Sequence, residues 1–244
     1  MLGVGALAVV AAAVFIGAAL NALAGFGFAL VTVPLMTLVV GPKEAVVLSA
    51  IVGLLSNSAV ALRHRSDIEV PVAKRLLLGS MLGMPLGLVV LTAIAEQPLE
   101  VLIAVAVLLS AVILATGWRL SRPSPTKDVA AGFLSGLFNT SIGISGPPVV
   151  VLLQGRGMAK AAFRATSVTV FGVAGVVALV LFAVGGQYNR SVLSAALVVL
   201  PALPLGWFVG DRAHRRLDEG PFRVLVLVLM AVTATVVLVE AVTA

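Results

Sequence analysis

The sequence predicts an all-α polytopic membrane protein made of two inverted repeats, each with five apolar segments. The composition is the first observation, because 61% of the 244 residues are hydrophobic and only 11% are charged, against about 25% in soluble domains. The second is that apolar stretches of roughly membrane-spanning length recur along the chain. The third is that a polar, glycine-rich break occurs twice, 118 residues apart.

The first repeat is predicted to cover residues 1–118. Its apolar segments are residues 4–22, 28–41, 44–62, 71–94 and 98–118. The break Asn21-Ala-Leu-Ala-Gly25-Phe-Gly27 separates the first two segments, Gly41-Pro42 ends the second, and Pro71 and Pro98 open the last two. Proline suits these positions because it has no N–H and interrupts a preceding helix.

A cytoplasmic linker is predicted at residues 119–127, which contain Pro123 and Pro125. The second repeat, residues 128–244, then follows the same plan. Its apolar segments are residues 128–141, 146–155, 159–183, 192–211 and 221–242.

Matching residues in the two halves indicate an internal duplication. Asn21, Gly25 and Phe15 correspond to Asn139, Gly143 and Phe133. Pro85-Leu86-Gly87 similarly matches Pro204-Leu205-Gly206, and Pro98 matches Pro221. Because each half has an odd number of segments, the two copies are predicted to cross the membrane in opposite directions.

The distribution of Lys and Arg supports this orientation. With both termini outside, the inner loops hold fourteen basic residues and the outer loops only Lys43 and Arg190, which is a strong positive-inside bias. We therefore expect a multi-pass protein of the cell inner membrane. The net charge of +6 is then a topology signal and does not indicate a nucleic-acid partner.

The second segment of each half is short for a full crossing. Residues 28–41 would span about 21 Å as a helix and residues 146–155 about 15 Å, whereas the hydrocarbon core is about 30 Å thick. Each first pair of segments is therefore predicted to form a broken or re-entrant hairpin, followed by three transmembrane helices. The two hairpins would enter from opposite faces and meet near the middle.

Residues 139–148 are the best candidate for a binding site, because they place several polar groups in an apolar region. Helix starts near Gly27 and Gly146 would direct free N–H groups toward an anion. The carbonyl ends of the preceding helices would instead favour a cation, so this alternative stays open. The candidate substrate-binding residues are Asn21, Gly25, Gly27, Asn139, Thr140, Ser141, Gly143, Ser145, Gly146, Arg164, Thr166 and Ser167.

Several classes of function lack their sequence signals. Cysteine is absent, and no Asp or Glu lies deep in an apolar segment, which disfavours a metal-cation substrate. No known catalytic motif occurs, so an enzyme is not expected. We expect no metal site and no cofactor.

At these breaks the chain resembles the TauE/SafE family of sulfite and organosulfonate exporters. The resemblance is carried by Gly25-Phe-Gly27-Phe-Ala-Leu-Val-Thr-Val-Pro34, Gly143-Ile-Ser-Gly146-Pro147-Pro148 and Arg164-Ala-Thr166-Ser167, with Ser49-Ala50 as a reduced copy of the last. It implies export of a small sulfur-containing anion such as sulfite or sulfoacetate. The family often has a run of glycines where this chain has Phe26 and Phe28, which would narrow or dry that side.

The sequence therefore favours a secondary transporter that exports a small anion by alternating access, with the half-repeats rocking around the site. An anion channel with paired re-entrant hairpins and a non-transport membrane scaffold are the two alternatives. The expected partners are the anion and the lipid bilayer, and a homodimer stays open.

Overall fold

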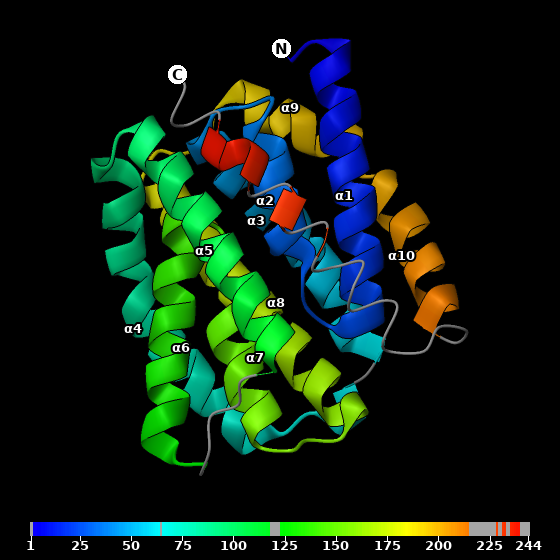
Figure 1. The fold of residues 1–244 in the computed structure, drawn as a ribbon, viewed down its shortest axis with the longest axis vertical. Coiled ribbons are helices and arrows are strands. Elements are labelled where there is room, and N and C mark those ends of the chain that lie inside the picture. The colour runs from blue at the N-terminus through cyan, green and yellow to red at the C-terminus, as the bar shows by residue number, and fades with distance from the viewer. Residues whose placement is uncertain are drawn as a thin grey trace.

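The computed structural model describes residues 2–63, 65–117, 123–214, 228, 231–232 and 235–239. These residues are helical wherever they form regular structure (Figure 1). The elements are α1 (Val4–Ala24), α2 (Phe28–Thr37), α3 (Pro42–Arg63), the 3-10 turn η1 (Arg65–Asp67), α4 (Val70–Ala93), α5 (Glu96–Thr116), α6 (Pro125–Ser141), α7 (Gly146–Gly155), α8 (Lys160–Val184), α9 (Arg190–Val199) and α10 (Ala202–His214). Most of the segment predicted at 221–242 and most of the linker lie outside the described residues.

Five of the described helices are long and apolar enough to cross a membrane: α1, α3, α4, α5 and α8. The chain is therefore a polytopic membrane protein. The single segment predicted at residues 192–211 is instead two helices, α9 and α10, which meet at an angle of 46°. Pro201 lies at the bend, where its missing N–H interrupts the helical hydrogen bonds.

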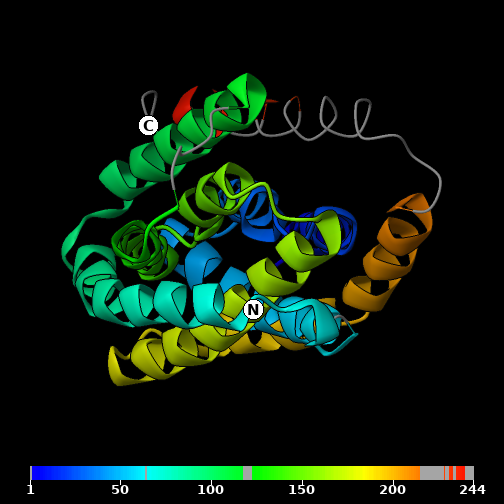
Figure 2. The ribbon, with the colours of Figure 1, turned by 90° about the horizontal axis from the view of Figure 1, so that it is seen from below.

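Helices α2 and α7 are the short return arms of two hairpins. Each has ten residues, so each is about 15 Å long. Gly25, Gly27 and Gly143 have positive φ values and make the turns at the two tips. Most side chains of both return arms are buried, and Figure 2 shows α2 and α7 inside a ring that includes α4, α5 and α10.

Two helix pairs pack with almost no side chain between them. In the first, the Cα of Gly83 on α4 faces the backbone carbonyl of Phe133 on α6, so that an added Cβ would lie 2.1 Å from this oxygen. In the second, a Cβ at Gly206 on α10 would lie 2.2 Å from the carbonyl oxygen of Phe15 on α1. Each pair joins one helix from the first half of the sequence to one from the second (Figures 1 and 2).

Helix α6 begins inside the stretch that was assigned to the linker. Pro125 occupies the first turn, and the Ser124 hydroxyl accepts a hydrogen bond from the Lys127 N–H at 3.3 Å. A serine cap followed directly by proline is a favourable helix start. Asp128 therefore lies one turn inside a helix rather than at a loop boundary.

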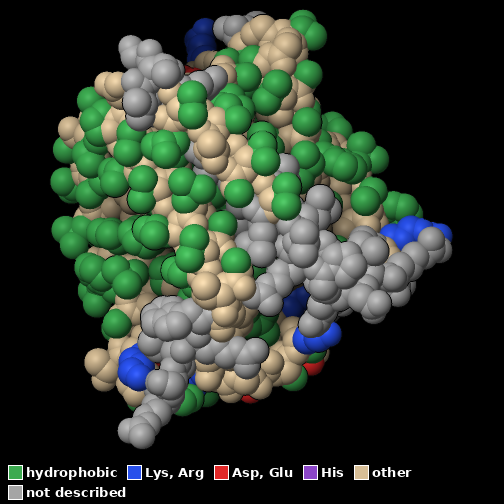
Figure 3. All heavy atoms as spheres, in the orientation of Figure 1, with side chains coloured by type: hydrophobic (Ala, Val, Ile, Leu, Met, Phe, Trp, Pro, Cys, Tyr) green, Lys and Arg blue, Asp and Glu red, His purple; other side chains and the backbone are tan. Residues whose placement is uncertain are grey.

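Polar contacts distinguish the two ends of the helix bundle. The starts of α4, α6 and α8 lie at one end, where Arg75 and Arg156 each form an ion pair with Asp128. At the other end Asn189 donates a hydrogen bond to Glu44 at 2.6 Å. Hydrophobic side chains cover most of the visible face between the ends, and most of the Lys and Arg side chains in view lie in its lower half (Figure 3).

Candidate functional site

A cavity of about 50 Å³ lies between the two chain breaks. Residues of both hairpins and of α3 and α8 form its wall. The lining residues are Asn21, Phe26, Gly27, Phe28, Ala29, Leu30, Ser49, Ala50, Gly53, Leu54, Asn57, Asn139, Gly143, Ser145, Gly146, Phe171 and Gly175. The structure thus brings the two breaks together, although 118 residues separate them in the sequence.

The start of α2 supplies backbone donors to this wall. A helix leaves its first N–H groups without an intrahelical acceptor. The N–H groups of Phe28, Ala29 and Leu30 also have no acceptor elsewhere among the described residues. Because none of the described residues that line the cavity is charged, these groups and the positive end of the helix dipole set its polarity in favour of an anion.

The start of α7 contributes fewer donors than the sequence suggested. The N–H groups of Ser145 and Gly146 have no acceptor among the described residues. Pro147 and Pro148 follow directly and have no N–H at all. The two arms are therefore not equivalent, and the start of α2 is the richer source of donors.

Asn21 and Asn139 occupy matching positions, but their surroundings differ. The Asn21 amide nitrogen donates to the Ser56 hydroxyl at 3.0 Å and to the Asn57 side-chain oxygen at 3.1 Å. At the positions of α8 that correspond to Ser56 and Asn57, the chain has Ala174 and Gly175, which offer no side-chain partner. Asn139 forms no side-chain hydrogen bond within the described structure and lines the cavity.

The two hydroxyls after Asn139 are turned to other partners. Thr140 donates to the carbonyl oxygen of Met84 on α4 at 2.6 Å, and Ser141 donates to the carbonyl oxygen of Leu137 at 2.7 Å. Neither residue lines the cavity. Hydroxyls in membrane helices commonly bond a neighbouring helix or their own backbone in this way.

Three further site residues predicted from the sequence, Arg164, Thr166 and Ser167, lie on α8 outside the cavity wall. Arg164 is buried and contacts Gly25, where an added Cβ would lie 2.7 Å from the Arg164 side chain. The Thr166 hydroxyl accepts from the Glu69 N–H at 3.0 Å, and Ser167 is fully buried. None of Arg164, Thr166 and Ser167 lines the cavity.

Seven lining residues on the long helices were not among the predicted site residues. They are Ser49, Ala50, Gly53, Leu54 and Asn57 on α3, and Phe171 and Gly175 on α8. Ser49 and Asn57 are polar residues in an apolar helix, which is a usable signal. Phe171 and the glycines have no such signal, because nothing in the sequence indicates which face of a buried helix meets a cavity.

Comparison with known proteins shows which protein family this chain resembles. The family described as sulfite exporter TauE/SafE matches residues 9–237, which is nearly the whole chain. The chain belongs to the TauE/SafE family. A probable sulfite/organosulfonate exporter TauE from Cupriavidus necator is 26% identical over 199 residues, covering 77% of this chain and 76% of that protein. No solved structure matches the chain.

Membership in the TauE/SafE family confirms the resemblance seen at the breaks. The chain is a multi-pass membrane protein, and its family is one of membrane exporters rather than a class of enzymes. The TauE/SafE match extends across both hairpins and the helices between them. Both halves of the cavity wall therefore lie in the part of the chain that the family shares.

Proposed function

We propose that this protein exports sulfite, or a closely related small sulfur oxyanion, by alternating access across the cell inner membrane. The observation that carries the proposal is the uncharged cavity into which two helix starts direct unpaired N–H groups. Oriented backbone N–H groups at helix starts bind anionic oxygens without a charged side chain. Family membership supplies the chemical class of the anion.

The proposed ligands are fewer than the sequence indicated. Asn139 and the N–H groups of Ser145 and Gly146 would contact the anion from the second hairpin. The N–H groups at the start of α2 would contact it from the first, and Asn57 from α3. Gly27 and Gly143 would allow the backbone to approach closely.

Three carbonyl oxygens near the ends of α1 and α6 already accept hydrogen bonds. The carbonyl oxygen of Phe138 accepts from the N–H groups of Ile142 and Ile144. The Leu137 carbonyl oxygen accepts from Ser141, and the Asn21 carbonyl oxygen accepts from Gly25. These three oxygens are therefore less available to a cation, whereas the N–H groups at the start of α2 have no acceptor among the described residues and remain available to an anion.

The size of the cavity favours the smallest family substrate. A cavity of about 50 Å³ has room for roughly three to five water molecules. Sulfite, a sulfur with three oxygens, is of this size, whereas sulfoacetate carries a further carboxylate arm. Phe26 and Phe28 limit the space on one side, so we expect sulfite to be carried faster than sulfoacetate.

We propose further that the two halves form inverted repeats around the site. Gly25 at the first tip packs on Arg164 of α8, and Gly143 at the second tip packs on Val46 of α3. Val46 and Arg164 are themselves 118 residues apart. Matching residues in the two halves thus make matching contacts, which is the arrangement an inverted repeat requires.

Counterflow of labelled sulfite and sulfoacetate in proteoliposomes tests the function. A carrier preloaded with unlabelled substrate accumulates label transiently, which a channel cannot do. We expect Asn139→Ala to lower this uptake by about tenfold, the effect of losing one hydrogen bond to a charged group. Absence of flux for both anions with folded wild-type protein would contradict the proposed substrate.

A further inference from the structure

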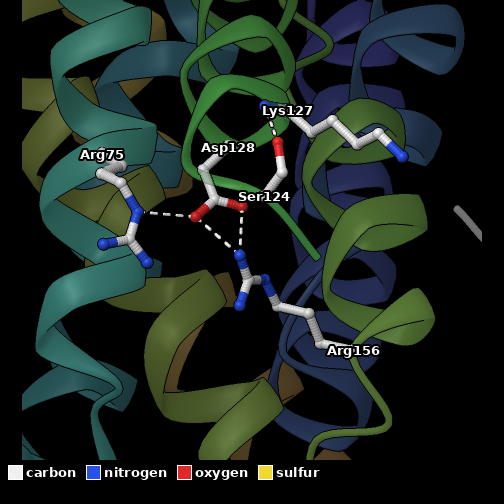
Figure 4. Close-up of polar contacts among 5 residues, drawn as sticks. All are labelled: Arg75, Ser124, Lys127, Asp128 and Arg156. Carbon is white, nitrogen blue, oxygen red and sulfur yellow. Dashed lines mark hydrogen bonds and ion pairs between the residues drawn. The ribbon is translucent and has the colours of Figure 1, made fainter. Parts of the chain in front are cut away.

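A buried carboxylate lies at the base of the second hairpin, outside the cavity wall. Asp128 on α6 has no solvent exposure. Its oxygens accept from Nε of Arg75 on α4 at 2.7 Å and from Nη2 of Arg156 at 2.5 and 2.7 Å. Figure 4 shows the carboxylate between the two guanidinium groups, near the Ser124 cap of α6.

The guanidinium groups of Arg75 and Arg156 carry more positive charge and more N–H donors than the single carboxylate of Asp128 can pair with. They carry two positive charges against one negative charge, and each engages Asp128 through a single nitrogen. Nε of Arg156 is buried and has no hydrogen-bond partner among the residues that the structure describes. Guanidinium groups normally bind oxyanions with two parallel N–H bonds, so this pair has capacity for a second anion.

The second hairpin connects this charged group directly to the cavity. Asp128 and Asn139 both lie on α6, about 16 Å apart along the helix axis. Gly146, which lines the cavity, opens α7, and Arg156 directly follows α7 about 15 Å away. The tip of the hairpin thus forms the cavity wall, and its base carries the ion pairs.

We propose that Arg75 and Arg156 form an admission site, meaning the site that binds the transported oxyanion before it enters the cavity. In the absence of the anion, Asp128 occupies the two arginines and keeps this site closed. Sulfite arriving at this end binds the unused guanidinium nitrogens and replaces the carboxylate as the partner of Arg156. Release of Arg156 frees the end of α7 from α4 and α6. No covalent step is involved.

The packing determines which ion pair can open. Arg75 and Asp128 lie on α4 and α6, whose backbones are in direct contact through Gly79, Gly83 and Gly132. Arg156 lies beyond the end of α7, and at Gly146, which opens this helix, an added Cβ would meet no described atom within 4 Å. The Arg156–Asp128 pair is therefore the one that an incoming anion separates.

The inference rests on the proposed function, and sulfite uptake into everted membrane vesicles tests it. Asp128→Asn removes the competitor, so KM for sulfite should fall about threefold or more. Arg156→Gln removes the guanidinium group that binds the anion, so KM should rise about tenfold. Glu44→Gln, an acid-to-amide change at the opposite end of the molecule, is the matched control and should leave KM unchanged.

A double variant provides a second test in case the Asp128→Asn protein does not fold. Asp128→Asn with Arg75→Gln restores the charge balance and leaves Arg156 unopposed, so KM should again fall. Unchanged KM in the double variant and in Arg156→Gln, with changes only in the amount of folded protein, would overturn the admission site and leave a purely structural ion pair.

Binding without transport separates this inference from the proposed function. If wild-type vesicles take up no sulfite, the proposed substrate fails. The admission site is then judged with sulfite alone, by its protection of detergent-solubilised protein against thermal unfolding. Protection of the wild type but not of Arg156→Gln supports the site, and equal or no protection of both contradicts it.

Discussion

At the scale of single residues, two asparagines that look equivalent in the sequence have different surroundings. The Asn21 side chain bonds Ser56 and Asn57 inside the protein. Asn139 faces the cavity and has no such partner in the described part of the chain. The 118-residue spacing identified both residues, but it could not separate their roles, because these depend on whether α3 or α8 offers a polar side chain.

We expect alanine substitutions to separate the two roles. Asn21→Ala should lower the free energy of unfolding by about 1–3 kcal/mol, because it leaves buried polar groups without a partner. Asn139→Ala should lower sulfite transport with little change in the melting temperature. Thermal unfolding in detergent and counterflow, measured on both variants, check this, and the reverse assignment of effects would contradict it.

The chemical character of residues 139–148 was predictable, and the direction of each side chain was not. A polar break in an apolar segment indicated a ligand site, and Asn139, Ser145 and Gly146 do line the cavity. Thr140 and Ser141 are adjacent in sequence but bond backbone carbonyls. Asp128 was overlooked because a carboxylate near a loop is usually solvated, whereas here the two arginines allow its full burial.

At the scale of helices, glycines determine how closely α4 and α6 approach. An added Cβ at Gly83 would lie 2.1 Å from the Phe133 carbonyl oxygen, far inside van der Waals contact. The spacing of Gly79, Gly83 and Gly87 is typical of helices that pack closely. It could not predict the partner, because α6 lies in the other half of the sequence.

Gly83→Ala should therefore force α4 and α6 apart and destabilise the protein by about 1–3 kcal/mol or more. Gly5→Ala on α1 is the control, since a Cβ there meets no atom within 4 Å. Melting temperatures in detergent should fall for Gly83→Ala and stay constant or rise slightly for Gly5→Ala. Equal melting temperatures for the two variants would mean that this contact is not tight.

At the scale of the whole molecule, the distribution of charge predicts which end faces the cytoplasm. The end with Arg75 and Arg156 should lie inside, and the end with Glu44 and Asn189 should lie outside. The chain contains no cysteine, so single cysteines can report this without further changes. The uptake experiment with everted membrane vesicles depends on this orientation.

We expect Gln97→Cys to react with a membrane-impermeant maleimide in intact cells, because this exposed residue opens α5 at the outer end. Ser66→Cys in η1 is equally exposed but should react only after the membrane is permeabilised. Labelling of Ser66→Cys alone in intact cells would reverse the predicted orientation.

Most of the helical plan could be predicted from apolar length and from Pro and Gly positions. Nine of the ten segments predicted from the sequence fall within the described part, and eight of these correspond to single helices. The exception is residues 192–211, where the bend at Pro201 gives two helices. Proline marks a possible interruption, but the packing of α9 and α10 decides whether the helix bends or continues.

The glycine contacts also determine which parts of the protein can slide past one another. Helix α4 is joined to α6, and α10 to α1, by backbone surfaces that interlock. Each interlocked pair takes one helix from each half of the gene product, so the halves of the chain are not separate mechanical bodies. If the protein works by the proposed alternating access, we expect both of these contacts to stay closed during the movement. We then expect the sliding surface to lie between the two pairs, where α3 contacts α8.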